Sequence, residues 1–342
     1  MAIIIDVPGF LTSVQDGGRY GLQQYGVTAA GAADQLSYAY ANLLVGNTNG
    51  EAALEATMLG PTLRFTQDTV FALTGADMDA KLNGRSIPRY QTLKAKADSA
   101  LALGYAKAGC RAYIAFAGGI DVPLVMGSRS TFLRGKFGGF EGRKLEKDDR
   151  LELGKSSLPE NALRRRHIRP DNFPSDTIEL RVIRGPQDAM FSADGMRTFL
   201  TGTYTVTNEC DRMGVRLDGP QIGYAPGCNG NINSDGIAFG SIQVPPNGKP
   251  IIMMAERQTT GGYTKIAAVA TVDLPLLVQA KPGMKIRFAE IAVEQAQALL
   301  LQQAEHMRAL QQEFDAPAAN GAECWQVMMN GSWYEATIER IE

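Results

Sequence analysis

The feature that most constrains the fold of this chain is a succession of short apolar runs, each closed by glycine, proline or another turn-forming residue. Runs such as "IIID", "VFALTG", "RAYIAFAGG" and "IELRVIRG" are followed by "TYTVT", "PIIMMA" and "KIRF". These runs are short, and they do not alternate with helical segments in a repeating strand–helix order. Glycine is abundant, at 37 of 342 residues, and "LNG" at 82–84 predicts a tight turn. The pattern predicts a mainly β protein made of barrels or sandwiches.

Helices are expected in only a few places. In "ADQLSYAYANLLVGN" the residues Leu36, Tyr40, Leu43 and Leu44 share one face, and Gly46 is suited to end the helix. "DLPLLVQAKPG" predicts a short helix with Asp273 as its N-cap. "AEIAVEQAQALLLQQAEHMRALQQEF" predicts a long amphipathic helix near the C-terminus.

A chain of 342 residues is too long for one small core, so we expect more than one domain. Prolines, serines and charges collect between the two groups of strands, which indicates a linker. The predicted division is a first lobe at 1–155 including the N-terminal helix region, a linker at 156–176, a second lobe at 177–290, a helix at 291–316 and a hairpin at 317–342. The hairpin would turn at Asn330-Gly331.

Charge and composition exclude several functions. The net charge is −2, and the basic run Arg164–Arg166 is isolated, so we expect a solvated linker there and no nucleic-acid or anionic-membrane surface. No apolar run reaches the roughly 18 residues of a membrane span, and the start has no secretory pattern. The four cysteines are widely spaced, as expected of reduced thiols in a cytoplasmic protein.

The residue inventory also limits the chemistry. Only two histidines, His167 and His306, are present, which argues against Ser-His-Asp or Cys-His catalysis and against a histidine-rich metal site. "LELGKSS" is not a phosphate-binding loop, because Asp149 stands where its first glycine is required. We therefore expect no metal, and any nucleotide is expected mainly on a partner.

Four polar segments flanked by glycine remain as candidates for a site: 12–34, 117–132, 210–219 and 231–266. Each could simply supply turns and Arg–Asp contacts between loops. Four of them in one chain favour a shared polar site. The candidate substrate-binding residues are Gln15, Arg19, Arg129, Arg212, Gln243, Gln258, Thr260, Gly261 and Gly262.

The fourth segment, with "ERQTTGGYTKI" following an apolar run, carries the most chemistry. Burial at the end of that run would suit Glu256 to act as a base. Lys265 and Tyr263 could polarise a carbonyl group or stabilise an oxyanion. Backbone at Gly261 and Gly262 could approach a ligand closely. Glu256, Lys265 and Tyr263 are the candidate catalytic residues.

These segments together resemble the allophanate hydrolase subunit 2 family. The resemblance is carried by "TSVQDGGRYG", "ANLLVGN", "AGGIDVPLVMGSRST", "RVIRGPQ", "DRMGVRL" and "IQVP…ERQTTGGYTKIA", in order from about Ile3 to Phe288. It implies two cyclophilin-like β-barrel lobes and a cleft completed by a subunit resembling allophanate hydrolase subunit 1. Where the family has aspartate, this chain has Glu256, whose carboxylate reaches one methylene further.

The resemblance implies three possible functions. The first is the C subunit of an ATP-dependent 5-oxoprolinase, which opens 5-oxo-L-proline to L-glutamate with a further partner of the lactam-utilisation type. The second is a biotin-dependent carboxyltransferase acting on urea or a related amide, which would bring biotin carboxylase and a biotin carrier as partners. The third is a non-catalytic regulator that antagonises a kinase-inhibitor-like partner. The C-terminal "WQVMMNGSWYEATIERI" faintly resembles the opening segment of biotin-carrier modules or the segments that dock them. The alternative is a hairpin that serves only for packing or dimer formation.

Overall fold

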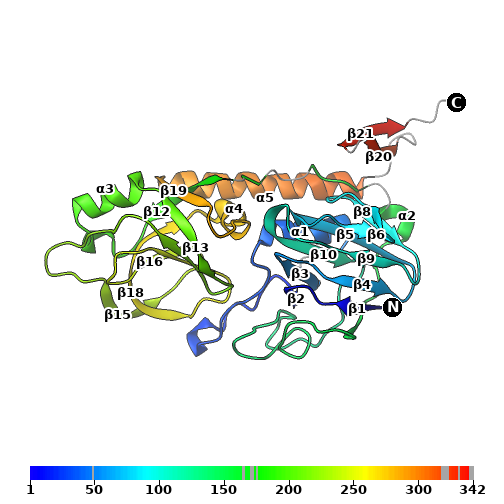
Figure 1. The fold of residues 1–342 in the computed structure, drawn as a ribbon, viewed down its shortest axis with the longest axis horizontal. Helices are drawn as coiled ribbons and strands as arrows, with labels where there is room; N and C mark the ends of the chain where they lie inside the picture. The colour runs from blue at the N-terminus through cyan, green and yellow to red at the C-terminus, as the bar shows by residue number, and fades with distance from the viewer. Residues whose placement is uncertain are drawn as a thin grey trace.

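The structure is a computed structural model that describes residues 1–47, 50–163, 166–169, 173–174, 176–316, 323–329 and 332–338. The chain is mainly β, and Figure 1 shows two β-rich lobes side by side with a long helix lying across both. We call the part carrying strands β1–β11 the first lobe and the part carrying β12–β19 the second lobe. The expected mainly β architecture with few helices is confirmed.

Two sheets build the first lobe. One has the strand order β11-β1-β4-β9-β6-β7, and the other has the order β2-β3-β10-β5-β8. An apolar cluster that includes Ile3, Leu54, Phe65 and Phe116 is fully buried in this lobe. The strands are β1 (Ala2–Val7), β2 (Leu11–Gln15), β3 (Ala53–Thr57), β4 (Thr62–Phe65), β5 (Thr69–Asp77), β6 (Lys81–Leu82), β7 (Arg85–Ser86), β8 (Thr92–Ala95), β9 (Ala100–Ala102), β10 (Ala108–Phe116) and β11 (Arg150–Glu152).

The second lobe is one sheet that closes on itself. Its order is β12-β19-β13-β14-β17-β16-β18-β15, and a further pairing of β12 with β18 completes a barrel. Closure leaves few free strand edges and encloses a core that includes Leu180, Ile242, Ile252 and Ile286. The strands are β12 (Thr177–Arg184), β13 (Tyr204–Cys210), β14 (Gly214–Asp218), β15 (Asn231–Gly236), β16 (Ser241–Val244), β17 (Ile251–Met253), β18 (Thr260–Val269) and β19 (Lys285–Glu290).

The three expected helices are present. They are α1 (Gln35–Leu44), α4 (Leu274–Val278) and α5 (Val293–Asp315). Two more were not expected, α2 (Glu160–Leu163) and α3 (Ala193–Thr201), together with the 3₁₀ turns η1 (Gln23–Tyr25), η2 (Asp188–Met190) and η3 (Thr271–Asp273). Helix α3 was missed because it is short and carries a glycine in its first turn. Its N-cap Ser192 accepts a hydrogen bond from that Gly195 N–H at 2.9 Å.

Helix α5 crosses both lobes (Figure 1). Met307, Leu310 and Phe314 pack on the apolar cluster beneath α1, and the His306 ring lies 6.5 Å from that of Tyr40. None of the helix residues is fully buried, so its contact with the lobes is a shallow one. Beyond it, β20 (Glu323–Met329) and β21 (Ser332–Ile338) pair antiparallel as the predicted hairpin, whose turn lies outside the described residues.

One local expectation holds only in part, and another was wrong. Asp273 occupies the N-cap position of α4, but its carboxylate accepts hydrogen bonds from Arg181, at 2.7 Å from the backbone N–H and 2.9 Å from Nε. Arg166 is only 4% exposed, although the basic run was predicted to be solvated. Its guanidinium donates to the Leu43 carbonyl at 2.9 Å and stacks over Phe314, because the end of α1 leaves carbonyl groups without helical partners. Arg164 and Arg165 lie outside the described residues.

Candidate active site

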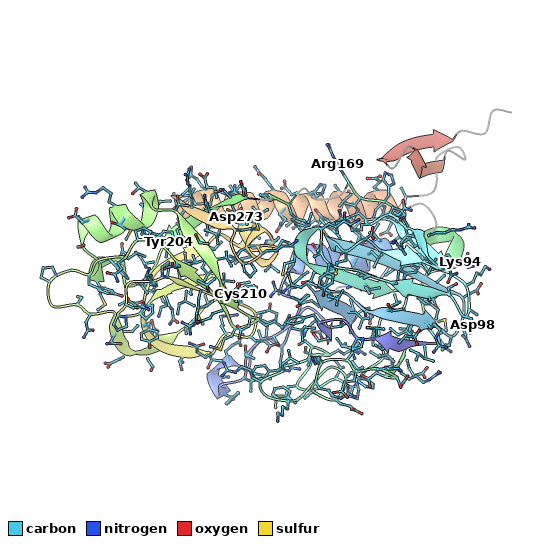
Figure 2. All side chains as sticks on the ribbon, in the orientation of Figure 1. Lys94, Asp98, Arg169, Tyr204, Cys210 and Asp273 are labelled. Atoms are coloured by element: carbon cyan, nitrogen blue, oxygen red, sulfur yellow. The ribbon has the colours of Figure 1, made fainter. Side chains whose placement is uncertain are left out.

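Arg212 lies in the turn between β13 and β14, at the boundary of the two lobes. Figure 2 shows the neighbouring Cys210 on the side of the second lobe that faces the first. The Asp211 carboxylate stabilises this turn by accepting the backbone N–H groups of Met213 and Gly214, at 2.7 and 3.0 Å. Arg212 itself is 4% exposed, so its guanidinium requires partners within the protein.

Three segments supply those partners. The Arg212 Nε donates to Oε1 of Glu256 at 2.6 Å, Nη2 donates to the Gly31 carbonyl at 2.5 Å, and Nη1 donates to Glu55. Burial by itself would lower the pKa of Arg212, but the Glu55 and Glu256 carboxylates outweigh burial and raise it. The guanidinium therefore joins the first lobe to the segment that begins the candidate loop.

Glu55 stands in the middle of β3, a strand whose five residues are all buried. Its Oε2 accepts from the Tyr113 hydroxyl at 2.7 Å and from the Ala33 N–H at 2.8 Å, and Oε1 lies 3.7 Å from Nε of Arg111. Burial opposes ionisation of this carboxyl, yet the Arg212 and Arg111 guanidiniums hold its pKa below the usual range. Glu55 is thus a buried, charged anchor for Arg212.

Gln279 makes a second polar connection between the lobes. Its Oε1 accepts from the backbone N–H groups of Cys110 and Arg111, at 2.8 and 2.9 Å. Its Nε2 donates to the Asp34 carboxylate at 2.8 Å and to the Arg111 carbonyl at 2.9 Å. The pairing of β10 with β5 is irregular between Ala108 and Ala112, so a side chain from the other lobe satisfies these backbone groups.

Gln15, Arg19 and Arg129 lie together among the loops of the first lobe. Arg19 is buried and donates to the carbonyls of Val125 and Ser130, at 2.9 and 3.0 Å, while Gln15 donates to the Thr131 carbonyl at 3.2 Å. The Arg129 N–H donates to Asp16 at 2.5 Å. These bonds connect the first two polar segments. The predicted role of these residues in substrate binding stays a prediction.

Gln243 and Lys265 form a second group on neighbouring strands of the barrel. They are register partners on β16 and β18, and their side chains are 1% and 3% exposed. The Lys265 ammonium donates to the Asp235 carboxylate at 2.8 Å, and Gln187 donates to the same oxygen at 3.3 Å. Nε2 of Gln243 is buried with no hydrogen-bond partner in the part of the chain that the structure describes. A buried amide donor in this state is available to a ligand oxygen.

Gly261 lies between Gln243 and Gln258, which belongs to the loop that begins at Glu256. A Cβ at Gly261 would lie 2.9 Å from Nε2 of Gln243 and 3.3 Å from Nε2 of Gln258, so only glycine leaves these amides in place. Gln258, Thr260 and Tyr263 are exposed, and Gly262 is half-buried. Thr28 donates to the Arg257 carbonyl at 2.9 Å and ties the loop to the first lobe. The four predicted polar segments are therefore connected in space.

Several residues of this network were not predicted. Glu55, Arg111, Tyr113 and Gln279 connect the lobes, and Asp235 pairs with Lys265. A charged residue inside the apolar strand "ALEAT" was the one available signal for Glu55. Nothing local marks Gln279, because its partners are more than 160 residues away in the chain.

Two searches of the described residues found nothing. No group of histidine, cysteine or acidic residues there is arranged to hold a metal ion. No helix there is long and apolar enough to cross a membrane. The described cysteines Cys110, Cys210 and Cys228 form no disulfide, and Cys324 is not described at the side-chain level.

Residues 25–290 match the carboxyltransferase domain, subdomain A and B, and the chain belongs to that family. Among curated proteins, it is 37% identical over 295 residues to the C subunit of 5-oxoprolinase from Escherichia coli, covering 84% of this chain and 91% of that protein. It is 33% identical to urea amidolyase of Saccharomyces cerevisiae, covering 87% of this chain and 17% of that protein.

The chain is also similar in structure to a solved protein. The crystal structure of the Kluyveromyces lactis urea carboxylase superposes with a TM-score of 0.84 at 29% identity. The superposition covers 99% of this chain and 32% of that one. It therefore includes α5 and the C-terminal hairpin.

Proposed function

We propose that this chain is the C subunit of an ATP-dependent 5-oxoprolinase, which cleaves 5-oxo-L-proline to L-glutamate together with partner subunits. The observation that carries the proposal is the share of each relative's length that aligns with this chain. The alignments span 91% and 94% of the 5-oxoprolinase C subunits of Escherichia coli and Haemophilus influenzae. The same chain spans only 17% of urea amidolyase.

The chemistry of the candidate site is consistent with an amide substrate. The Lys265 ammonium is already balanced by Asp235, so the pair favours a neutral carbonyl oxygen over a second carboxylate. Gln243 offers an unpaired amide N–H beside it. Together they would polarise the lactam carbonyl, with the exposed Tyr263 hydroxyl as a third donor. In this proposal Glu256 accepts a proton through the carboxylate oxygen that Arg212 does not bind.

The proposed partners are an allophanate hydrolase subunit 1-like chain and a lactam-utilisation-type chain. ATP is assigned mainly to a partner, because this sequence has neither of the familiar phosphate-binding loops. In this arrangement the present chain binds and orients the lactam, and the partner completes the cleft.

The experiment is reconstitution with both partners and measurement of 5-oxoproline-dependent glutamate and ADP formation. Tyr263→Phe and Glu256→Gln are expected to lower kcat by about a hundredfold or more, the usual size of a lost proton-transfer or oxyanion contact. Tyr105→Phe is the matched control, because Tyr105 is 73% exposed and lies in the first lobe. Turnover of Glu256→Gln equal to that of the unaltered complex would refute the base role.

Carboxyl transfer from biotin is the second candidate, and the C-terminal region favours it. The urea carboxylase superposition covers 99% of the chain and so includes α5 and the hairpin. Mixing the chain and its subunit 1-like partner with carboxybiotin carrier and urea tests this candidate. A carboxylated amide product supports it, and absence of product with urea and related amides counts against it.

A further inference from the structure

A cavity of about 510 Å³ opens in the first lobe, between residues 121–142 and β11. Its walls are largely apolar, and its lining carries three carboxylates and one guanidinium. The apolar lining is Val122, Pro123, Val125, Phe137, Phe140 and Leu151. The candidate catalytic residues Glu256, Lys265 and Tyr263 do not line this cavity. The candidate substrate-binding residues Arg19 and Arg129 contact its walls from behind.

Buried polar side chains hold the walls in position. Arg19 donates to the Val125 carbonyl at 2.9 Å, and its guanidinium lies 4.9 Å from the centre of the Phe137 ring. Nε of Arg129 donates to the Val122 carbonyl at 3.2 Å. Ser128, on the same loop, donates to Asp16 at 2.8 Å. The cavity is therefore formed before any ligand arrives, as binding pockets usually are.

Two of the three lining carboxylates have ion-pair partners. Glu141 accepts from Nη2 of Arg143 at 2.8 Å, and Glu152 accepts from Nε of Arg150 at 2.8 Å. The Asp121 N–H donates to the Glu152 carbonyl at 2.9 Å, which fixes Asp121 beside them. Its carboxylate is exposed and has no partner among the described residues. An apolar cavity with one uncompensated carboxylate at its edge suits a cation on an apolar stem.

The surroundings point to a protein as the source of that cation. Leu124 and Met126, on the loop that forms one wall, are 59% and 56% exposed. Large apolar side chains beside a pocket are typical of a protein–protein contact surface. We propose that this cavity receives a lysine or arginine side chain of the allophanate hydrolase subunit 1-like partner, with Leu124 and Met126 packing around it. The identity of the partner rests on the proposed function. The position of the docking site rests on the cavity and its lining residues.

Binding of the purified partner by isothermal titration tests the inference. Asp121→Asn is expected to raise Kd about tenfold and to weaken its dependence on salt, since it removes the uncompensated charge. Leu124→Gln should raise Kd similarly without changing the salt dependence. Glu179→Gln is the matched control, because Glu179 is an exposed acid on β12 of the second lobe and should leave Kd unchanged.

The outcomes separate the two proposals. Wild-type Kd in both Asp121→Asn and Leu124→Gln overturns the docking site, as does an equal loss in Glu179→Gln. Failure of the unaltered chain to bind this partner overturns it as well. A complex that binds through Asp121 but does not cleave 5-oxoproline overturns the proposed function and leaves the docking site standing.

Discussion

The Arg212 guanidinium, from the second lobe, donates a hydrogen bond to the carboxylate of Glu55, from the middle of a buried strand of the first lobe. Both side chains are at most 3% exposed. Glu256, the first residue of the candidate loop, binds the same guanidinium. The contact that joins the lobes thus also positions the loop proposed to act on substrate.

Replacement of Arg212 by methionine should destabilise the protein strongly. The substitution leaves Glu55 and Glu256 buried without their shared cation, and breaking a buried pair in this way costs about 3–5 kcal/mol. Urea unfolding measures the change. Arg216→Met, on the same hairpin, is the control: Arg216 is about half exposed and pairs with Glu209, so its loss should cost about 1 kcal/mol or less. Equal effects of the two substitutions would contradict the prediction.

The contribution of Glu55 to stability should depend on pH. Burial opposes its ionisation, but Arg212 and Arg111 hold its pKa below the ordinary value of 4.5. A depressed pKa gives stability that is present above about pH 4.5 and is lost as the pH falls through the native pKa. The difference in unfolding free energy between the unaltered chain and Glu55→Gln should therefore shrink as the pH drops below about 4.5. A difference that stays constant down to acid unfolding would exclude this account.

Loss of the Gln279 amide should weaken hydrogen bonding of backbone N–H groups in the first lobe. In Gln279→Ala the N–H groups of Cys110 and Arg111 lose their acceptor, at a cost of about 1–3 kcal/mol. Hydrogen exchange should accelerate at these two amides, which the irregular pairing of β10 leaves dependent on this side chain. Gln311→Ala is the control, because Gln311 is exposed on α5 and its amide donates to the carboxylate of Asp315 on the same helix. Unchanged protection at both amides would show that they have another acceptor.

The two adjacent glycines of the candidate loop should respond differently to alanine. At Gly261 a Cβ would come within 2.6 Å of Ile237 and 2.9 Å of the Gln243 amide, so Gly261→Ala should displace that amide and lower activity. At Gly262 the nearest atom would be a carbonyl oxygen at 3.4 Å, an ordinary contact, so Gly262→Ala should be tolerated. Circular dichroism and activity of the reconstituted complex measure both. Equal activities would remove Gly261 and Gln243 from the site.

Local pattern was enough to predict several of the elements. The apolar runs and turn residues of "IIID", "VFALTG" and "RAYIAFAGG" match β1, β5 and β10, and the apolar face ending at Gly46 matches α1. The pattern was insufficient where a polar residue took a distant partner. Asp273 binds Arg181 across 92 positions, so its carboxylate does not cap α4. Arg166 reaches Leu43 across 123 positions, so it is buried where a solvated residue was expected.

What the sequence by itself determined is the strand-rich composition of the chain, the family to which it belongs, and the residue types available for chemistry. The strand-rich composition follows from spacing within a few residues, where periodicity and turn preference act directly. The family follows from the motifs that this chain shares with it. Only the tertiary structure decided which polar residues share a site, because a buried charge must find its counter-charge wherever the chain packs. Glu256 and Glu55 are 201 positions apart, and both are held by the one guanidinium of Arg212.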